Sequence, residues 1–215
     1  IDKEIEYLEI ENGIEYNDLQ KEAIKNALVE NLTIITGGPG TGKTTIIKAI
    51  VALYKRLNKL SYGELVCDLA LLAPTGRASK RMCETTLYPA STIHRFLKWN
   101  KENNTFGICE SNKDKSKLII VDETSMIDIN LFSSLLSGLT DNIKLILVGD
   151  YDQLPSVGPG LVLKDLIESE KIKTIKLEYL YRQNSDSYIN LLAKEIKENN
   201  ITENSFKNYI DYRFL

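Results

Sequence analysis

The 215-residue chain has few residues that could build a disulfide or zinc framework. Its three cysteines, Cys67, Cys83 and Cys109, are odd in number and widely spaced, which disfavours a set of disulfides. The single histidine, His94, has no paired cysteines with which to form a structural zinc site. This cysteine usage indicates a reducing compartment, and we expect a cytoplasmic protein.

Long apolar runs and a strong charge bias are also missing. No apolar stretch approaches the roughly 20 residues of a membrane span, and no secretory leader opens the chain, so we expect no membrane association. A net charge of −3 argues against binding nucleic acid over the whole surface but permits a local basic track. The length suits one domain with a small insertion. Because the chain starts at Ile1 without a methionine, we expect a piece of a longer protein.

Short apolar runs alternate with amphipathic helical patterns along the chain. This alternation predicts an α/β fold, a parallel sheet with helices on both faces and ligands at the carboxyl ends of its strands. The predicted strands are Leu32–Thr36, Asp68–Ala73, Leu118–Val121 and Ile143–Val148, with Ile172–Leu177 as a further one. The predicted helices are Thr44–Leu57, Thr75–Thr85, Ile129–Leu139 and Gly160–Glu168, with Ser187–Asn199 as a closing helix.

One segment, Lys98–Lys117, breaks the alternation. It is polar and rich in Lys, Asn and Ser, with Thr105-Phe106-Gly107-Ile108 in its middle. We interpret it as an excursion from the sheet, either a small inserted hairpin or a mobile loop.

The most informative motif is the glycine-rich segment from Gly37 to Thr44, which fills every fixed position of the phosphate-binding loop G-x-x-x-x-G-K-[ST]. It stands between a predicted strand and a predicted helix, where backbone N–H groups and the helix dipole favour an anion. Lys43 can reach the outer phosphates of a nucleoside triphosphate, and the Thr44 hydroxyl can hold Mg²⁺. The predicted nucleotide contacts are Gly38, Pro39, Gly40, Thr41, Gly42, Lys43, Thr44 and Thr45.

Two further motifs follow predicted strands. Asp122 and Glu123 end an apolar strand, an arrangement that suits a Mg²⁺ ligand (Asp122) beside a base that polarises the attacking water (Glu123). Gln153 lies in the turn after the strand that ends at Val148, where its amide can sense the γ-phosphate. The alternatives are an acid that caps the next helix and a loop amide that bonds its own backbone.

Together these motifs resemble the first motor domain of superfamily 1 DNA helicases, in the RecD-like branch. The resemblance runs from about Tyr16 to about Lys197 and implies a RecA-like P-loop NTPase domain that uses ATP and Mg²⁺. The segments that carry it, in chain order, are Gly37–Thr44, Ala73–Ala78, Thr92–Phe96, Val121–Met126, Gly149–Gly160 and Tyr181–Gln183.

The resemblance implies roles for two more residues at the nucleotide. Gln20 matches the glutamine that reads the adenine edge, although an exposed helix residue is the alternative. Arg182 matches an arginine that reaches the γ-phosphate, and its planar, permanently charged fork suits phosphate oxygens. The alternative for Arg182 is a surface salt bridge.

The resemblance also implies contacts to single-stranded DNA. Pro74, Thr75, Gly76 and Arg77 match one strand-contacting motif, although Thr75 could simply cap a helix. A second such motif contains Thr92, His94 and Arg95, and for His94 a structural role is equally open. In the family, the segment matching Lys98–Lys117 is a hairpin that helps part the duplex, with Phe106 as a candidate wedge.

The family pattern is incomplete in this chain. Residues 1–215 are expected to form a single motor domain, without the family's N-terminal domain and second motor lobe. The implied partners are single-stranded DNA, duplex junctions and that second lobe; a nuclease partner cannot be identified from the sequence. The expected activity is ATP-driven 5′ to 3′ translocation and unwinding in recombination or repair. The alternatives are the helicase portion of a conjugative relaxase and a nucleotide-gated DNA-binding module without processive unwinding.

We predict that Lys43→Ala weakens binding of ATP–Mg²⁺ because it deletes the flexible cation directed at the outer phosphates. The loss of one charge-assisted contact should raise the dissociation constant roughly tenfold or more. Calorimetric titration of the purified chain measures this, with Lys59→Ala, outside the motif, as the control. Equal affinities for Lys43→Ala and the unsubstituted chain would rule out the assignment of the loop.

Overall fold

The structure is a computed structural model that describes residues 1–177 together with residues 192, 196 and 200. The chain divides into two compact units, Ile1–Tyr179 and Leu180–Leu215. The predicted closing helix and Arg182 lie outside the described residues.

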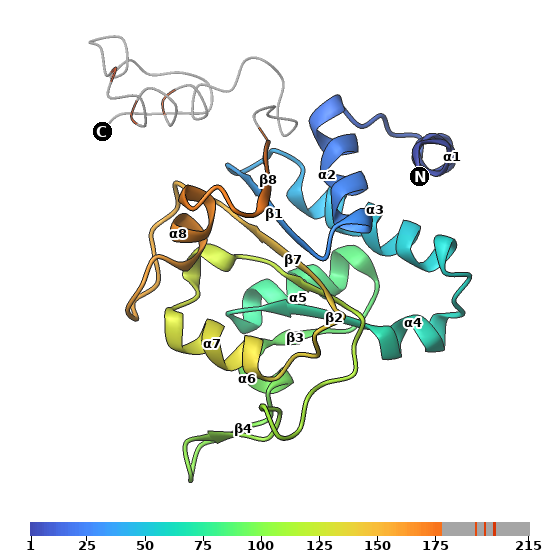
Figure 1. Cartoon of the computed structure of the whole chain (residues 1–215). Coiled ribbons are helices and arrows are strands. Elements are labelled where there is room, and N and C mark those ends of the chain that lie inside the picture. The colour runs from blue at the N-terminus through green and yellow to red at the C-terminus, as the bar shows by residue number, and fades with distance from the viewer. Residues whose placement is uncertain (178–191, 193–195, 197–199, 201–215) are drawn as a thin grey trace. The chain divides into compact units, whose positions relative to one another are not determined.

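A six-stranded sheet forms the centre of the first unit (Figure 1), and all of its strand pairs are parallel. Its order is β3-β2-β6-β7-β1-β8, with β1 Leu32–Gly37, β2 Leu69–Ala73, β3 Ala90–Thr92, β6 Leu118–Val121, β7 Lys144–Gly149 and β8 Lys173–Leu177. The five predicted strands are therefore confirmed within a residue or two. Strand β3 was not predicted, because three half-buried residues carry too short a pattern.

The register of the strands brings the segments after β1, β6 and β7 to one edge of the sheet. Thr36 pairs with Gly149 near the ends of β1 and β7, and Val121 at the end of β6 pairs with Leu147. The polar residues that follow these strands therefore lie side by side. This is the edge at which ligands bind in open parallel sheets.

Helices cover both faces of the sheet, as predicted (Figure 1). Side chains alternate along each strand, so Ile35 faces one apolar core and Ile34 faces the other. The first core is closed by α1 Asp2–Asn12, α2 Asp18–Val29, α3 Lys43–Leu57, α4 Tyr62–Asp68 and α5 Gly76–Thr86. The second is closed by α6 Ile93–Phe96, α7 Ile129–Ser137 and α8 Val162–Glu168, and a 3-10 turn, η1 Thr124–Met126, leads into α7.

Helix α1 was not predicted, because only Ile5 and Leu8 of its residues are buried. Ion pairs attach the rest of it to the neighbouring helices. Arg56 of α3 pairs with both Glu4 and Glu11, and Lys25 of α2 pairs with Asp2 at 2.9 Å. A left-handed Gly13 ends the helix.

The excursion predicted over Lys98–Lys117 contains a hairpin rather than a mobile loop. Strands β4 Trp99–Asn100 and β5 Thr105–Phe106 pair antiparallel, with Trp99 opposite Phe106. The hairpin is attached to the second core, because Ile108 is buried there and Phe106 packs against it.

Among the described residues, no helix combines the length and the apolar character needed to cross a membrane.

We predict that Gly37→Ala destabilises the fold whereas Gly38→Ala does not. A Cβ at Gly37 would lie 2.7 Å from Thr41 Oγ1 and 2.9 Å from both Leu177 Cβ and Leu177 O, but a Cβ at Gly38 meets nothing within 4 Å. Overpacking of this kind costs about 1–3 kcal/mol. Urea unfolding of the ligand-free variants measures it, and equal midpoints for the two would contradict the described packing around Gly37.

Candidate nucleotide-binding site

The loop between β1 and α3 is shaped by glycines and by its own hydrogen bonds. Gly40 and Gly42 have φ values of 83° and 89°, a left-handed conformation that side-chain-bearing residues rarely adopt. Thr41 is buried, and its hydroxyl donates to the Gly38 carbonyl at 2.9 Å. The loop therefore holds its curvature without a ligand, with the N-terminus of α3 at its end.

Lys43 spans the mouth of this loop. Its Nζ donates to the carbonyls of Gly37 at 2.5 Å and Gly38 at 2.9 Å. Burial lowers the pKa of Lys43, while the nearby charges of Asp150 and Asp122 raise it. A partly desolvated ammonium group that donates to two carbonyl oxygens is well suited to exchange them for phosphate oxygens.

The tandem acids lie at the end of β6. The backbone N–H of Asp122 donates to the Leu72 carbonyl at 2.9 Å, and the N–H of Glu123 donates to Asp122 Oδ1 at 2.9 Å. Burial raises the pKa of Asp122, and the charge of Glu123 raises it further. Glu123 itself has a φ of 53°, an uncommon value for a side-chain-bearing residue and typical of strained functional positions.

Gln153 is linked to η1, the turn that follows the tandem acids. The Ser125 hydroxyl donates to Gln153 Oε1 at 2.7 Å, so this oxygen has a partner in another segment of the chain. The turn that carries Gln153 is fixed to β1 as well, because the Tyr151 N–H donates to Thr36 Oγ1 at 3.0 Å. The sequence did not indicate Ser125, because its hydroxyl could have had many partners.

Gln20 is buried, with 3 % of its surface exposed, rather than standing exposed on its helix. It forms a capping box with Asn17 at the start of α2, and its Nε2 donates to the Thr41 carbonyl at 3.4 Å. In this structure both ends of the amide have protein partners, and one of them is the phosphate-binding loop.

Two charged residues that the sequence analysis did not single out act on this edge. Asp150 is 9 % exposed and accepts from the N–H of Asp152 at 3.1 Å, and its charge raises the pKa of Lys43. Burial is the largest influence on both groups and lowers the pKa of Lys43 but raises the pKa of Asp122. The charge of Arg81, on α5, lowers the pKa of both. The available signal for Arg81 was its place one helical turn after Arg77.

The residues at this edge of the sheet fit a metal ion that is also bound by phosphate oxygens better than one bound by protein side chains alone. Within the described part of the chain, no three His, Cys, Asp or Glu side chains gather where they could hold an ion. Mg²⁺ commonly uses one or two carboxylates together with phosphates and water. Asp122 is half-buried and directly follows β6, and Thr44 lies in the first turn of α3.

The candidate DNA contacts gather at neighbouring strand ends. Ala73 at the end of β2 pairs with Thr92 at the end of β3, so the two motifs that follow them are adjacent. Thr75 caps α5 by accepting from the Ala78 N–H at 3.2 Å, and Thr92 similarly caps α6. Pro74 is half-buried, whereas Gly76, Arg77 and Arg95 are exposed.

His94 lies in an aromatic cluster with the hairpin. Its ring meets the ring of Trp99 edge-on, with the centroids 5.4 Å apart, and its centroid lies 6.1 Å from that of Phe106. Phe106 is partly buried, whereas Trp99 is 44 % exposed. Of these two hairpin aromatics Trp99 is the more exposed, and the role of Phe106 as a candidate wedge stays a prediction.

A family model described as an AAA domain matches residues 20–159. The RecD subunit of the RecBCD enzyme from Buchnera aphidicola subsp. Schizaphis graminum is 31 % identical, covering 93 % of this chain and 41 % of that protein. The RecD subunit from Mycolicibacterium smegmatis is 38 % identical over 69 % of the chain and 30 % of its own length. An ATP-dependent RecD2 DNA helicase from Deinococcus radiodurans is 40 % identical, covering 71 % of this chain and 20 % of that protein. The chain thus spans less than half of these relatives.

Solved structures share the fold. Pif1 helicase from Candida albicans has a TM-score of 0.64 at 22 % identity, covering 89 % of this chain and 46 % of that one. Bacteroides Pif1 bound to single-stranded DNA has a TM-score of 0.59 at 18 % identity, covering 90 % of this chain and 48 % of that one. These likenesses support the RecA-like arrangement of sheet and helices.

We predict that Asp122→Asn raises the thermal stability of the ligand-free protein at neutral pH. Because burial raises the native-state pKa of Asp122, the ionised carboxylate costs stability above that pKa and nothing below the unfolded pKa of about 3.9. The gain in Tm should therefore appear as the pH rises through the native pKa and vanish at acid pH. Calorimetric scans from about pH 3 to about pH 8 measure this change in Tm, because they start below the unfolded pKa of an aspartate and end well above it.

The matched control for this measurement is Asp141→Asn, because the side chain of Asp141 is 98 % exposed. Its Tm should differ little from that of the unsubstituted chain across the same range. A Tm for Asp122→Asn that equals the unsubstituted value at every pH would contradict a cost of burying the Asp122 carboxylate.

Proposed function

Because the chain belongs to the AAA domain family and is a RecD-like helicase motor domain by its sequence, we propose that it is the ATP-binding first lobe of a DNA helicase. The lobe would couple ATP hydrolysis to 5′ to 3′ movement along single-stranded DNA and to duplex unwinding in recombination or repair. The observation that carries this proposal is the meeting of Lys43, Asp122 and Gln153 at the carboxyl edge of one parallel sheet.

The phosphate-binding loop would hold the nucleotide through its own backbone. Residues Gly38 to Thr45, except Pro39, which has no N–H, would offer backbone N–H groups at the start of α3. Lys43 would leave the Gly37 and Gly38 carbonyls to bind the outer phosphates. Thr44 and Asp122 would hold Mg²⁺, which supplies charge neutralisation at the phosphates. Gln20 would bind the adenine edge, and its hydrogen bond to Thr41 would keep that contact in register with the loop.

Glu123 would act as the base that orients and deprotonates the attacking water, and Gln153 would contact that water and the γ-phosphate. The Ser125–Gln153 hydrogen bond supports these roles because it joins the two motifs. Arg182, which lies outside the described residues, would add a second cation at the γ-phosphate.

Single-stranded DNA would cross the ends of β2 and β3. Pro74, Thr75, Gly76 and Arg77 would contact one part of the strand, with a phosphate at the N-terminus of α5. His94 and Arg95 would contact the next part. The adjacency of Ala73 and Thr92 supports one continuous path for the strand.

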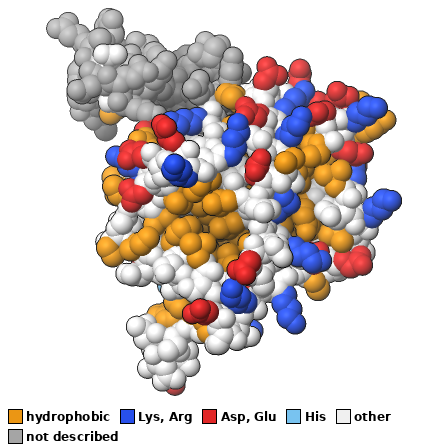
Figure 2. Space-filling model, viewed as in Figure 1, with side chains coloured by type: hydrophobic (Ala, Val, Ile, Leu, Met, Phe, Trp, Pro, Cys, Tyr) orange, Lys and Arg blue, Asp and Glu red, His pale blue; other side chains and the backbone are white. Residues whose placement is uncertain are grey.

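A second motor lobe would complete the site from outside this domain. Apolar side chains near the Gln153 turn support such a partner, because several are more exposed than is usual on the surface of a monomeric protein. Leu154 is 84 % exposed and Val157 is fully exposed, and Met126, Ile129 and Leu161 are also exposed. Figure 2 shows hydrophobic side chains gathered on this face, in the region of α7 and α8.

The relaxase alternative has no observation of its own in its favour, since the curated relatives described above are RecD proteins. The module that binds DNA without hydrolysis is distinguished by the experiment that follows.

We predict that Glu123→Gln, in the whole protein that contains this chain, lowers DNA-stimulated ATP hydrolysis by about 10²–10⁴-fold. The affinity for ATP–Mg²⁺ should stay within roughly threefold, because a carboxamide keeps the shape and the loss falls on proton transfer. Steady-state phosphate release with oligo(dT) and calorimetric titration measure the two quantities.

Glu6→Gln is the control, because Glu6 is an exposed residue of α1 outside the motifs. Two results would overturn the proposal. Hydrolysis that survives in Glu123→Gln would move the base to another residue. Hydrolysis that is absent from the unsubstituted protein, despite nucleotide-dependent DNA binding, would favour the non-hydrolysing module.

A further inference from the structure

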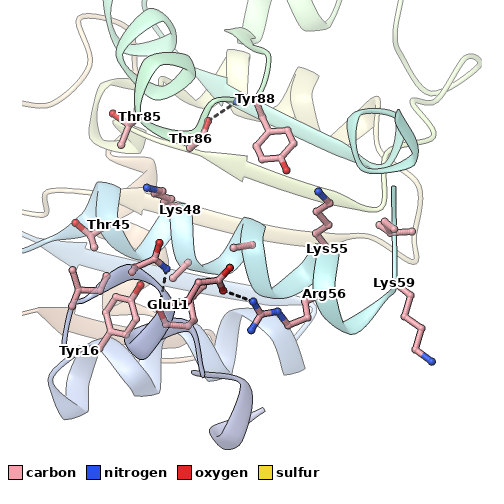
Figure 3. Close-up of a pocket in the computed structure, with 16 residues that line it drawn as sticks. Glu11, Tyr16, Thr45, Lys48, Lys55, Arg56, Lys59, Thr85, Thr86 and Tyr88 are labelled. Carbon is pink, nitrogen blue, oxygen red and sulfur yellow. Dashed lines mark hydrogen bonds and ion pairs between the residues drawn. The ribbon is translucent and has the colours of Figure 1, made fainter. Parts of the chain in front are cut away.

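A groove of about 750 Å³ runs along the outer side of α3 (Figure 3). Helix α1 forms one wall, and the end of α5 with the segment that carries Tyr88 forms the other. One end of the groove lies at Thr45, next to the phosphate-binding loop, and the other lies at Lys59 beyond the last turn of α3. No residue to which we assign phosphate or DNA contacts, apart from Thr45, lines it.

Positive charge follows the length of this groove. Lys48 and Lys55 lie seven positions apart on α3, a spacing that keeps both side chains on one side of the helix, and Lys59 lines the groove just beyond the helix end. At 1.5 Å per residue, Lys48 and Lys55 are about 10 Å apart along the helix. None of the three has an acidic group within 4.0 Å among the described residues, whereas Arg56 is paired with Glu4 and Glu11. Among the described residues the three lysines therefore have no ion-pair partner, and the acid that lines the same groove, Glu11, is already paired with Arg56.

The floor of the groove is apolar. Leu8 from α1, Ala49 and Ala52 from α3, and Leu60 line it between the charged side chains. Leu8 and Ala49 are buried, whereas Ala52 and Leu60 are half-buried and present the open part of this floor to an occupant. An apolar floor bordered by a basic row matches an amphipathic helix that carries acidic residues along one side.

Nucleic acid fits the groove less well, because open aromatic faces are scarce in it. Single-strand binding sites combine basic residues with aromatic platforms on which bases stack. Tyr16 is 4 % exposed, and Tyr88 already stacks on Tyr62 with ring centroids 5.2 Å apart. The apolar floor also offers nothing to a phosphate backbone.

We propose that this groove is a docking site for an acidic amphipathic helix of a partner protein. The apolar face of that helix packs on Ala52 and Leu60, which are half-buried, and its carboxylates pair with Lys55 and Lys59. The proposal goes beyond the helicase function and uses a surface separate from the DNA path at β2 and β3.

The test uses a fluorescein-labelled helical peptide with a leucine face bordered by glutamates, and follows its binding to the chain by anisotropy at physiological salt. Lys55→Glu/Lys59→Glu should weaken binding at least about tenfold, because like charges then face each other. Lys115→Glu/Lys171→Glu carries the same change of charge at exposed sites outside the groove and should bind as the unsubstituted chain does.

A steric variant separates docking in the groove from loose attraction between charges. Ala52→Trp fills the floor without changing the charge and should also weaken peptide binding by about tenfold or more. Thermal melting and ATP titration of every variant check that the fold and the nucleotide site are intact, so a failure here differs from a failure of the proposed function.

Three outcomes would overturn the proposal. The first is a peptide affinity that Ala52→Trp leaves unchanged, and the second is no measurable peptide binding. The third is tighter binding of labelled oligo(dT) than of the peptide, together with loss of that DNA binding in Lys55→Glu/Lys59→Glu, which would make the groove a nucleic-acid track.

A matched peptide with glutamine in place of glutamate should bind at least about tenfold more weakly to the unsubstituted chain.

Discussion

The parallel pairing of β1 with β7 is the constraint on which the rest of the structure depends. It places Thr36 beside Gly149, and the hydrogen bond from the Tyr151 N–H to Thr36 Oγ1 continues the pairing beyond the last strand residues. The phosphate-binding loop and the Gln153 turn therefore begin at neighbouring positions on the carboxyl edge of the sheet. A shift of one residue would exchange the two buried faces of β1 and separate the loop from the acids of β6.

Strands of the sheet could be predicted from sequence because each buried one is a continuous apolar run between polar turns. Leu118–Val121 is the clearest case, with all four residues buried. Strand β3 and helix α6 are too short to carry a period, and they depend on tertiary contacts instead. Helix α1 depends on ion pairs to distant residues such as Arg56, which no local pattern can indicate.

The candidate site shows the same division. The loop residues and the tandem acids could be predicted because their chemistry needs a fixed local spacing, as in Gly37–Thr44. Contacts between distant segments could not be predicted, since a serine or an arginine has many potential partners. The pairing of Ser125 with Gln153, and the burial of Gln20 against Thr41, are features of the assembled fold.

Strand β3 has a consequence for how this domain behaves at high concentration. It forms one edge of the sheet, and it is only three residues long, with Pro89 immediately before it. Exposed edges offer unpaired N–H and C=O groups to other chains, and short strands beside proline limit such pairing. At this edge the fold therefore carries a built-in protection against self-association through strand addition, which a longer β3 would remove.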